Sequence, residues 1–180
     1  LETYNLKHWA RHVDDFVFMY NSLLQAQGLQ QEYLDHPSLF TFLIFPIFYK
    51  IFYFFNYLNF YNLDGFIKQS DIDYSLNQLF FVSQISIFVF TCVLLIFFFK
   101  ITKKFNGRKF DTLYLSLLLI FSTGFLHQST RIESGLISTT FLLVSYFFLI
   151  KFLESENKKA IIFLSLVFIF SLSAIMQKKL

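Results

Sequence analysis

Two adjacent carboxylates, Asp14 and Asp15, begin a stretch with helical periodicity, residues 14–27. Apolar side chains recur there at intervals of three or four, at Phe16, Met19, Tyr20, Leu23 and Leu24. Carboxylates at a helix N-terminus stay ionised, and ionised carboxylates act as general bases or as ligands of a divalent metal ion. The structural alternative is that Asp14 is only the N-cap of an interfacial helix that ends at Gly28.

Two cationic side chains stand near predicted helix ends, where they could hold a phosphate group. His36 precedes Pro37 and a long apolar segment, and its imidazole can be protonated near neutral pH. Lys178 follows the last apolar run, where an ammonium group can contact a lipid phosphate. The structural alternatives are a turn before a proline-initiated helix for His36 and snorkelling of the side chain for Lys178.

A second polar cluster lies in the short segment 127–134, between two apolar runs. Arg131 and Glu133 are two residues apart there, and such a pair at the mouth of two helices can contact a polar ligand at the bilayer surface. A solvated turn, with Glu133 near the N-terminus of the next helix, explains the same residues equally well. The sequence leaves both interpretations open.

The bulk composition is that of an integral membrane protein. Of the 180 residues, 56% are hydrophobic and only 15% are charged, whereas soluble domains have about 45–50% apolar and about 25% charged residues. The mean hydropathy is +0.54, and the charges gather between long apolar runs. A single cysteine, Cys92, excludes an internal disulfide, and a net charge of +3 is too small to predict a nucleic-acid partner.

The apolar runs predict an all-α, polytopic bundle of membrane helices, with an external loop that carries a juxtamembrane helix. Residues 1–37 form the long polar loop, and residues 61–78 form a second polar loop. Residues 38–60 are apolar but contain a proline, a lysine and two asparagines, which favours an interfacial or re-entrant helix over a full span. Together the segments form a single, partial membrane domain. Four spans are predicted, at 79–99, 110–126, 135–150 and 160–176.

Lysines and arginines set the expected orientation. Five of them lie in residues 100–109, so this loop is predicted to be cytoplasmic. Alternation then puts 127–134 outside and 151–159 inside, in agreement with the preference of basic residues for the cytoplasmic side. The same alternation puts 61–78 outside, and it puts Lys178 outside against that preference.

The order of these motifs resembles the GT-C superfamily of integral membrane glycosyltransferases, and most closely the branch of protein O-mannosyltransferases and the aminoarabinose transferase of lipid A. In that branch an acidic motif opens the first external loop, and a juxtamembrane helix and a His or Lys before Pro-Pro-Leu follow. A later loop carries an acid, and a later span ends in a Thr-Lys motif. The corresponding stretches here are VDDFVFMYNSLLQAQGLQQEYLDHPSLF, STRIESGLISTTFLL and FSLSAIMQKK. The sequence departs from the pattern at Ser38, at Glu133 in place of Asp, and at Gln177 in place of Thr.

The resemblance implies an inverting transfer of a sugar from a polyprenyl-phosphate carrier to an acceptor at the outer membrane face. It implies that Asp14 is the catalytic base or the ligand of a divalent cation, with Asp15 in support. The other implied roles fall to polar residues at helix ends, namely His36 and Lys178 for the carrier phosphate and Arg131 and Glu133 for the sugar or acceptor. It also implies spans on both sides of this sequence, so we expect a fragment of a multi-pass protein of a bacterial inner membrane, inactive by itself.

A non-enzymatic membrane protein is the alternative function, either a transporter segment or a structural subunit of a membrane complex. Transporter cores commonly contain broken helices and charged residues at mid-span. The four predicted spans carry no charge in their middle, and we expect them to run without a break, which favours the enzyme. The sequence does not specify the sugar, the acceptor or the oligomeric state.

Overall fold

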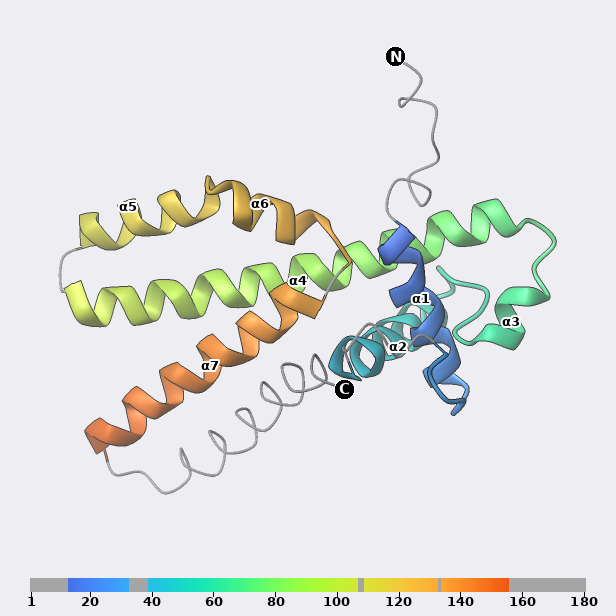
Figure 1. Cartoon of the computed structure of the whole chain (residues 1–180), viewed down its shortest axis with the longest axis horizontal. Coiled ribbons are helices and arrows are strands. Elements are labelled where there is room, and N and C mark those ends of the chain that lie inside the picture. The colour runs from blue at the N-terminus through green and yellow to red at the C-terminus, as the bar shows by residue number, and fades with distance from the viewer. Residues whose placement is uncertain (1–12, 33–38, 107–108, 133, 156–180) are drawn as a thin grey trace, which may run out of the picture. The chain divides into compact units, whose positions relative to one another are not determined.

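The computed structural model describes residues 13–32, 39–106, 109–132 and 134–155, and within these ranges the chain contains helices and no strand (Figure 1). The helices are α1 (Val13–Ala26), α2 (Leu39–Phe54), α3 (Leu63–Ile67), α4 (Ile72–Asn106), α5 (Lys109–Ile120), α6 (Thr123–Thr130) and α7 (Ser134–Ser155). The prediction of an all-α fold is therefore confirmed. The chain forms two compact units. The first contains α1, α2, α3, the part of α4 up to Ser86, and residues 131–132; the second contains the rest of α4 with α5, α6 and α7.

The first unit has an apolar core between α1, α2 and the start of α4. Its large, almost completely buried side chains are Met19, Leu23, Phe42, Phe45, Tyr49, Leu58, Phe60 and Leu79. Phe45 and Tyr49 are four residues apart on α2 and both are fully buried, so they define its inner face. The hydroxyl oxygens of Tyr49 and Ser83 are 2.9 Å apart, and this hydrogen bond ties α2 to α4.

Helix α1 ends where the sequence predicts. Gly28 has a φ of +79°, and the Leu29 N–H donates to the Leu24 carbonyl at 3.0 Å, which closes the last turn. The helix already includes Val13, so Asp14 lies inside its first turn. The prediction that Asp14 is the N-cap is therefore wrong, because an N-cap residue has a non-helical backbone. Phe16, which was predicted on the apolar face, is 39% exposed.

Helix α2 has 16 residues and ends before the apolar segment 38–60 does. Asn56 follows it in the left-handed conformation, with a φ of 58°, and the Tyr57 N–H donates to the Phe52 carbonyl at 2.9 Å. At 1.5 Å per residue the helix is about 24 Å long, which is less than the ~30 Å of a bilayer hydrocarbon core. That length agrees with a helix that does not cross the membrane, and its interfacial placement stays a prediction.

The predicted polar loop 61–78 contains helical segments, so that prediction is wrong in part. Helix α3 begins after Asn62, whose side-chain oxygen accepts the Gly65 N–H at 3.0 Å. Helix α4 begins well before residue 79 because Asp71 caps it by accepting the Tyr74 N–H at 2.9 Å. With its 35 residues α4 is about 52 Å long, so it exceeds the thickness of the hydrocarbon core.

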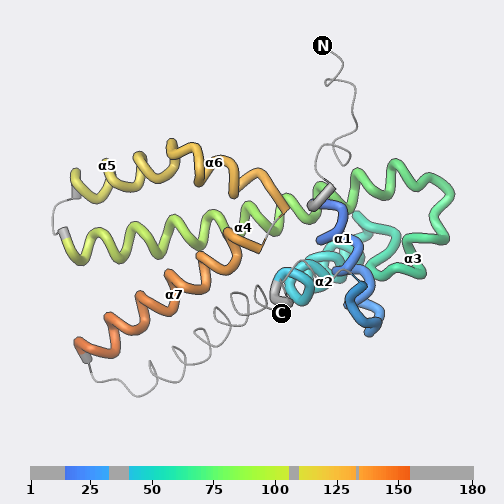
Figure 2. The backbone as a smooth tube through the Cα atoms, in the orientation of Figure 1, coloured from blue at the N-terminus to red at the C-terminus, as the bar shows by residue number. Residues whose placement is uncertain are grey.

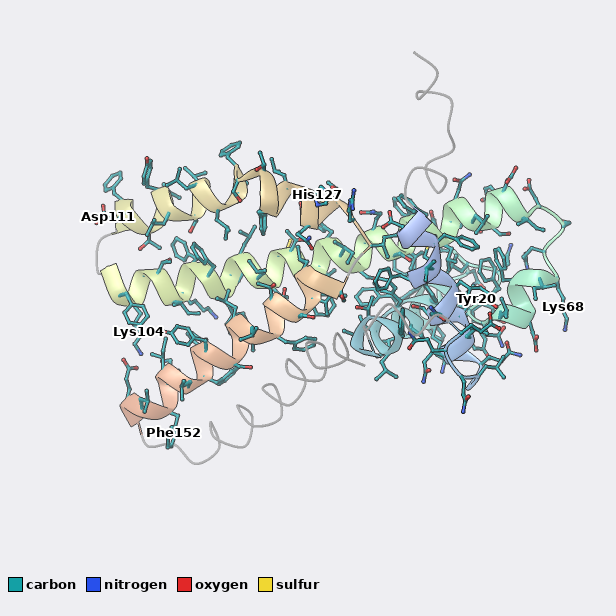
Figure 3. The ribbon with its side chains drawn as sticks, viewed as in Figure 1. Tyr20, Lys68, Lys104, Asp111, His127 and Phe152 are labelled. Atoms are coloured by element: carbon teal, nitrogen blue, oxygen red, sulfur yellow. The ribbon has the colours of Figure 1, made fainter. Side chains whose placement is uncertain are left out.

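In the second unit, α4 and α7 pack through aromatic side chains. The ring centroids of Phe90 and Phe141 are 5.8 Å apart, and those of Phe97 and Phe147 are 5.2 Å apart. At the C-terminal ends of the two helices an ion pair joins α4 to α7, between Lys104 (labelled in Figure 3) and Glu154. These two helix ends therefore lie together, which agrees with the prediction that the loops following them are on the same side of a membrane.

The predicted span 110–126 is broken. Helices α5 and α6 meet at an angle of 60° (Figure 2), so the expectation of an unbroken span is wrong. Ser122 explains the break, because its hydroxyl donates to the Leu119 carbonyl at 2.8 Å and accepts the Phe125 N–H at 3.3 Å. One side chain thus serves both the end of α5 and the start of α6.

Two helices of the described residues, α4 and α7, are long and apolar enough to cross a membrane. The bent pair of α5 and α6 makes a third candidate if it forms one span. The predicted spans 79–99 and 135–150 lie within α4 and α7. The predicted span 160–176 lies outside the described residues.

The ion pair between α4 and α7 predicts the outcome of a labelling experiment. In a Cys92→Ser background, Phe105→Cys and Leu153→Cys are expected to react with a membrane-impermeant maleimide only from the cytoplasmic side, because both side chains are exposed near that end. His127→Cys is expected to react only from outside, because His127 is exposed and belongs to the segment 127–134 that is predicted to lie outside. Labelling of Phe105→Cys and Leu153→Cys from opposite sides would contradict the predicted topology.

Candidate functional site

Asp15 lies at the centre of the candidate site, in the first unit. Its side chain is only 1% exposed, and its Oδ1 atom accepts the backbone N–H of Ile132 at 2.9 Å. Ile132 is fully buried and follows Arg131 directly. The hydrogen bond therefore joins the acidic motif at the start of α1 to the segment between α6 and α7. Both the acidic motif and this segment are candidate functional motifs in the sequence.

The burial of Asp15 follows from its place on α1. Met19 and Leu23 are fully or almost fully buried, and Asp15 is four residues before Met19, so all three lie on the inner face of the helix. A carboxylate on such a face needs hydrogen-bond donors, because an ionised group loses its hydration when it is buried. The Ile132 N–H supplies one donor.

A second group of polar side chains fastens the chain that follows α1. The Tyr20 hydroxyl (labelled in Figure 3) donates to Glu32 Oε2 at 2.8 Å. The Glu32 N–H donates to Asn21 Oδ1 at 3.2 Å, and Asn21 is buried. Residues 29–32 thus return along α1. Nothing in the spacing of Glu32, Tyr20 and Asn21 along the sequence predicts these hydrogen bonds.

Tyr49 is the buried ionisable group of α2. Burial raises the pKa of its phenol far above the usual value, and the hydrogen bond with Ser83 offsets only part of that effect. The phenol is therefore neutral at physiological pH and serves as a structural hydrogen-bonding group. Sequence reasoning did not single out Tyr49, because a tyrosine in an aromatic-rich segment looks like any other.

The structure brings some of the predicted site residues together, and others lie outside the described residues. Asp15 and the Arg131–Ile132 segment belong to one unit, and Arg131 is partly exposed. The backbone of Asp14 lies in the first turn of α1, but its side chain is outside the described ones. Three further predicted residues, His36, Glu133 and Lys178, lie outside the described residues.

A metal site is not formed by the described residues. No group of three or more His, Cys, Asp or Glu side chains among them has a geometry that could hold a metal ion. The prediction that Asp14 binds a divalent cation concerns a side chain outside this set, so it stays a prediction.

Comparison with known proteins adds no family to this picture. No protein-family model, curated protein or solved structure matches the chain.

Proposed function

We propose that the chain is part of a GT-C-type membrane glycosyltransferase that transfers a sugar from a polyprenyl-phosphate carrier to an acceptor at the outer membrane face. The observation that carries the proposal is the hydrogen bond from the Ile132 N–H to Asp15 Oδ1. It holds the acidic motif of α1 against the segment that carries Arg131. The resemblance drawn from the sequence puts these same two motifs in one site.

In the proposed reaction Asp14 accepts the proton of an acceptor hydroxyl group. The acceptor oxygen attacks the anomeric carbon from the face opposite to the phosphate. The bond between that carbon and the phosphate oxygen breaks, and polyprenyl phosphate leaves with the electron pair, which inverts the configuration. His36 and Lys178 stabilise the negative charge on the departing phosphate, because cations favour that charge in the transition state.

Asp15 has a different role from Asp14 in this proposal. Its carboxylate is buried and accepts a backbone N–H, so it is a positioning residue that holds the segment of Arg131 next to α1. Arg131, with Glu133, then lines the site of the sugar or acceptor. The candidate spans α4 and α7 support a lipid-borne donor, because they are long and apolar enough to anchor the chain in a membrane.

The test is a transfer assay with the complete protein in proteoliposomes. The donor is a radiolabelled sugar on a short polyprenyl phosphate, and the acceptors are a lipid A-type glycolipid and a Ser/Thr-rich peptide. Release of polyprenyl phosphate that depends on an acceptor is the expected result. No release with either acceptor would contradict the proposal. A parallel sample with EDTA, restored with Mg²⁺ or Mn²⁺, tests whether a divalent cation assists Asp14.

A transporter segment is the second candidate function, and the break between α5 and α6 is the observation that favours it. Discontinuous helices commonly line the substrate sites of transporters, where freed backbone groups contact the substrate. The same proteoliposomes distinguish the two functions. Gradient-driven uptake of a labelled solute, without release of polyprenyl phosphate, would favour the transporter.

A further inference from the structure

The second unit contains a cavity beside the break between α5 and α6. Its volume is about 380 Å³, which is within the range of about 300–1,000 Å³ typical of small-molecule sites. The lining is apolar for the most part, from Leu94, Leu119, Phe125 and Leu136, with Gly124 and Gly135 among them. The other lining residues are neutral and polar, namely Ser122, Gln128 and Thr139.

Gln128 supplies the most informative polar atom of this cavity. Its Oε1 atom is buried and has no hydrogen-bond partner among the described residues. A Cβ atom added at Gly135 would lie 2.6 Å from this oxygen, so only glycine leaves room for the amide in its present position. A buried acceptor without a donor is unfavourable, and a ligand with a hydrogen-bond donor would satisfy it.

The two hydroxyl groups of the lining can also accept a hydrogen bond from the ligand. The Ser122 hydroxyl donates to the Leu119 carbonyl at 2.8 Å, and the Thr139 hydroxyl donates to the Gly135 carbonyl at 2.8 Å. Both hydrogens are therefore used within the protein. The Ser122 oxygen also accepts the Phe125 N–H at 3.3 Å, and each of the two oxygens keeps a lone pair that can accept a further hydrogen bond. The lining contains no charged side chain, which disfavours a phosphate, a carboxylate or an ammonium group, because a buried charge needs a partner.

We infer that this cavity binds the uncharged, hydroxyl-bearing headgroup of a membrane glycolipid. Hydroxyl groups can donate to Gln128 Oε1 and to the two hydroxyl oxygens, and a headgroup built from a neutral hexose carries no charge. The source is a lipid because the lining comes from α4, α7 and the bent pair, which are the candidate membrane spans of the described residues. The inference does not depend on the proposed sugar transfer and holds equally for a transporter.

The experiment is a lipid titration of the purified chain by native mass spectrometry in detergent. Three lipids with the same acyl chains are compared: a monoglucosyl diacylglycerol, phosphatidylethanolamine and phosphatidylcholine, which has no donor. The glycolipid is expected to bind about five- to thirtyfold more tightly than phosphatidylcholine, as one or two neutral hydrogen bonds of about 1 kcal/mol each would give. Free methyl glucoside, tested separately, is expected not to compete. Competition by methyl glucoside would overturn the lipid as the source of the ligand.

Two variants test the role of the amide separately from the fold. Gln128→Leu removes the acceptor, and Gly135→Ala displaces it while keeping the glutamine; both are expected to abolish the preference for the glycolipid. Ser129→Ala is the matched control, because its hydroxyl donates to Leu126 of its own helix and it does not line the cavity. Thermal unfolding of each variant shows whether the chain remains folded. A preference that survives both substitutions, or equal binding of all three lipids, would overturn the inference.

Discussion

Replacing Asp14 with asparagine is expected to reduce sugar transfer by about 10²- to 10⁴-fold, which is the usual contribution of a positioned general base. Asparagine has nearly the shape of aspartate but cannot accept the proton of the acceptor hydroxyl at physiological pH. The loss is expected in kcat, with little change in the KM for the polyprenyl-phosphate donor, because the role proposed for Asp14 is to take a proton from the acceptor. The proteoliposome assay measures both parameters.

Asp64→Asn is the matched control for this substitution. Asp64 is also a carboxylate in the first turn of a helix, α3, in the loop that is predicted to lie outside, and its side chain is exposed. Its replacement is expected to leave transfer unchanged. Wild-type turnover in Asp14→Asn would remove Asp14 from the reaction, and with it the mechanism proposed above.

Replacing Asp15 with alanine is expected to destabilise the first unit by about 1.5–3 kcal/mol, because hydrogen bonds to charged groups have that magnitude. The substitution leaves the buried Ile132 N–H without its carboxylate acceptor. The segment of Arg131 then loses this hydrogen bond to α1, so transfer is expected to fall with the stability. Chemical denaturation and the transfer assay measure the two effects.

Asp15→Asn separates positioning from chemistry. The asparagine side chain keeps an oxygen that can accept the Ile132 N–H, so this variant is expected to recover most of the stability and most of the transfer. Rescue by asparagine at position 15 but not at position 14 would be the signature of one positioning and one catalytic carboxylate. Equal and complete loss of transfer in both asparagine variants would assign chemistry to Asp15 as well.

The helices themselves could be predicted where local signals are strong. Gly28 closes α1 because glycine readily adopts a positive φ, and the long apolar runs became α4 and α7. The start of α4 and the break between α5 and α6 could not be predicted, for the same reason. In each place one short polar side chain, Asp71 or Ser122, caps a helix within a stretch of uniform average composition. Window averages of hydropathy cannot detect one hydrogen bond.

The candidate site could be predicted only in part. Its members could be proposed because acids and cations stand at the ends of apolar runs. The contact of Asp15 with Ile132 could not be predicted from the sequence, because it joins a side chain to a backbone group 117 residues away. The burial of Asp15 depends on the rotation of α1, and the sequence pattern predicted Phe16 on the inner face, where Asp15 is found instead.

That same hydrogen bond constrains how the protein is made. The ribosome must add 117 residues after Asp15 before Ile132 exists, which takes roughly 6–23 s at about 5–20 residues per second. During that interval α2 to α6 are synthesised, and the carboxylate of Asp15 has not yet met the Ile132 N–H. The first unit therefore acquires this bond only after every described helix except α7 has been synthesised.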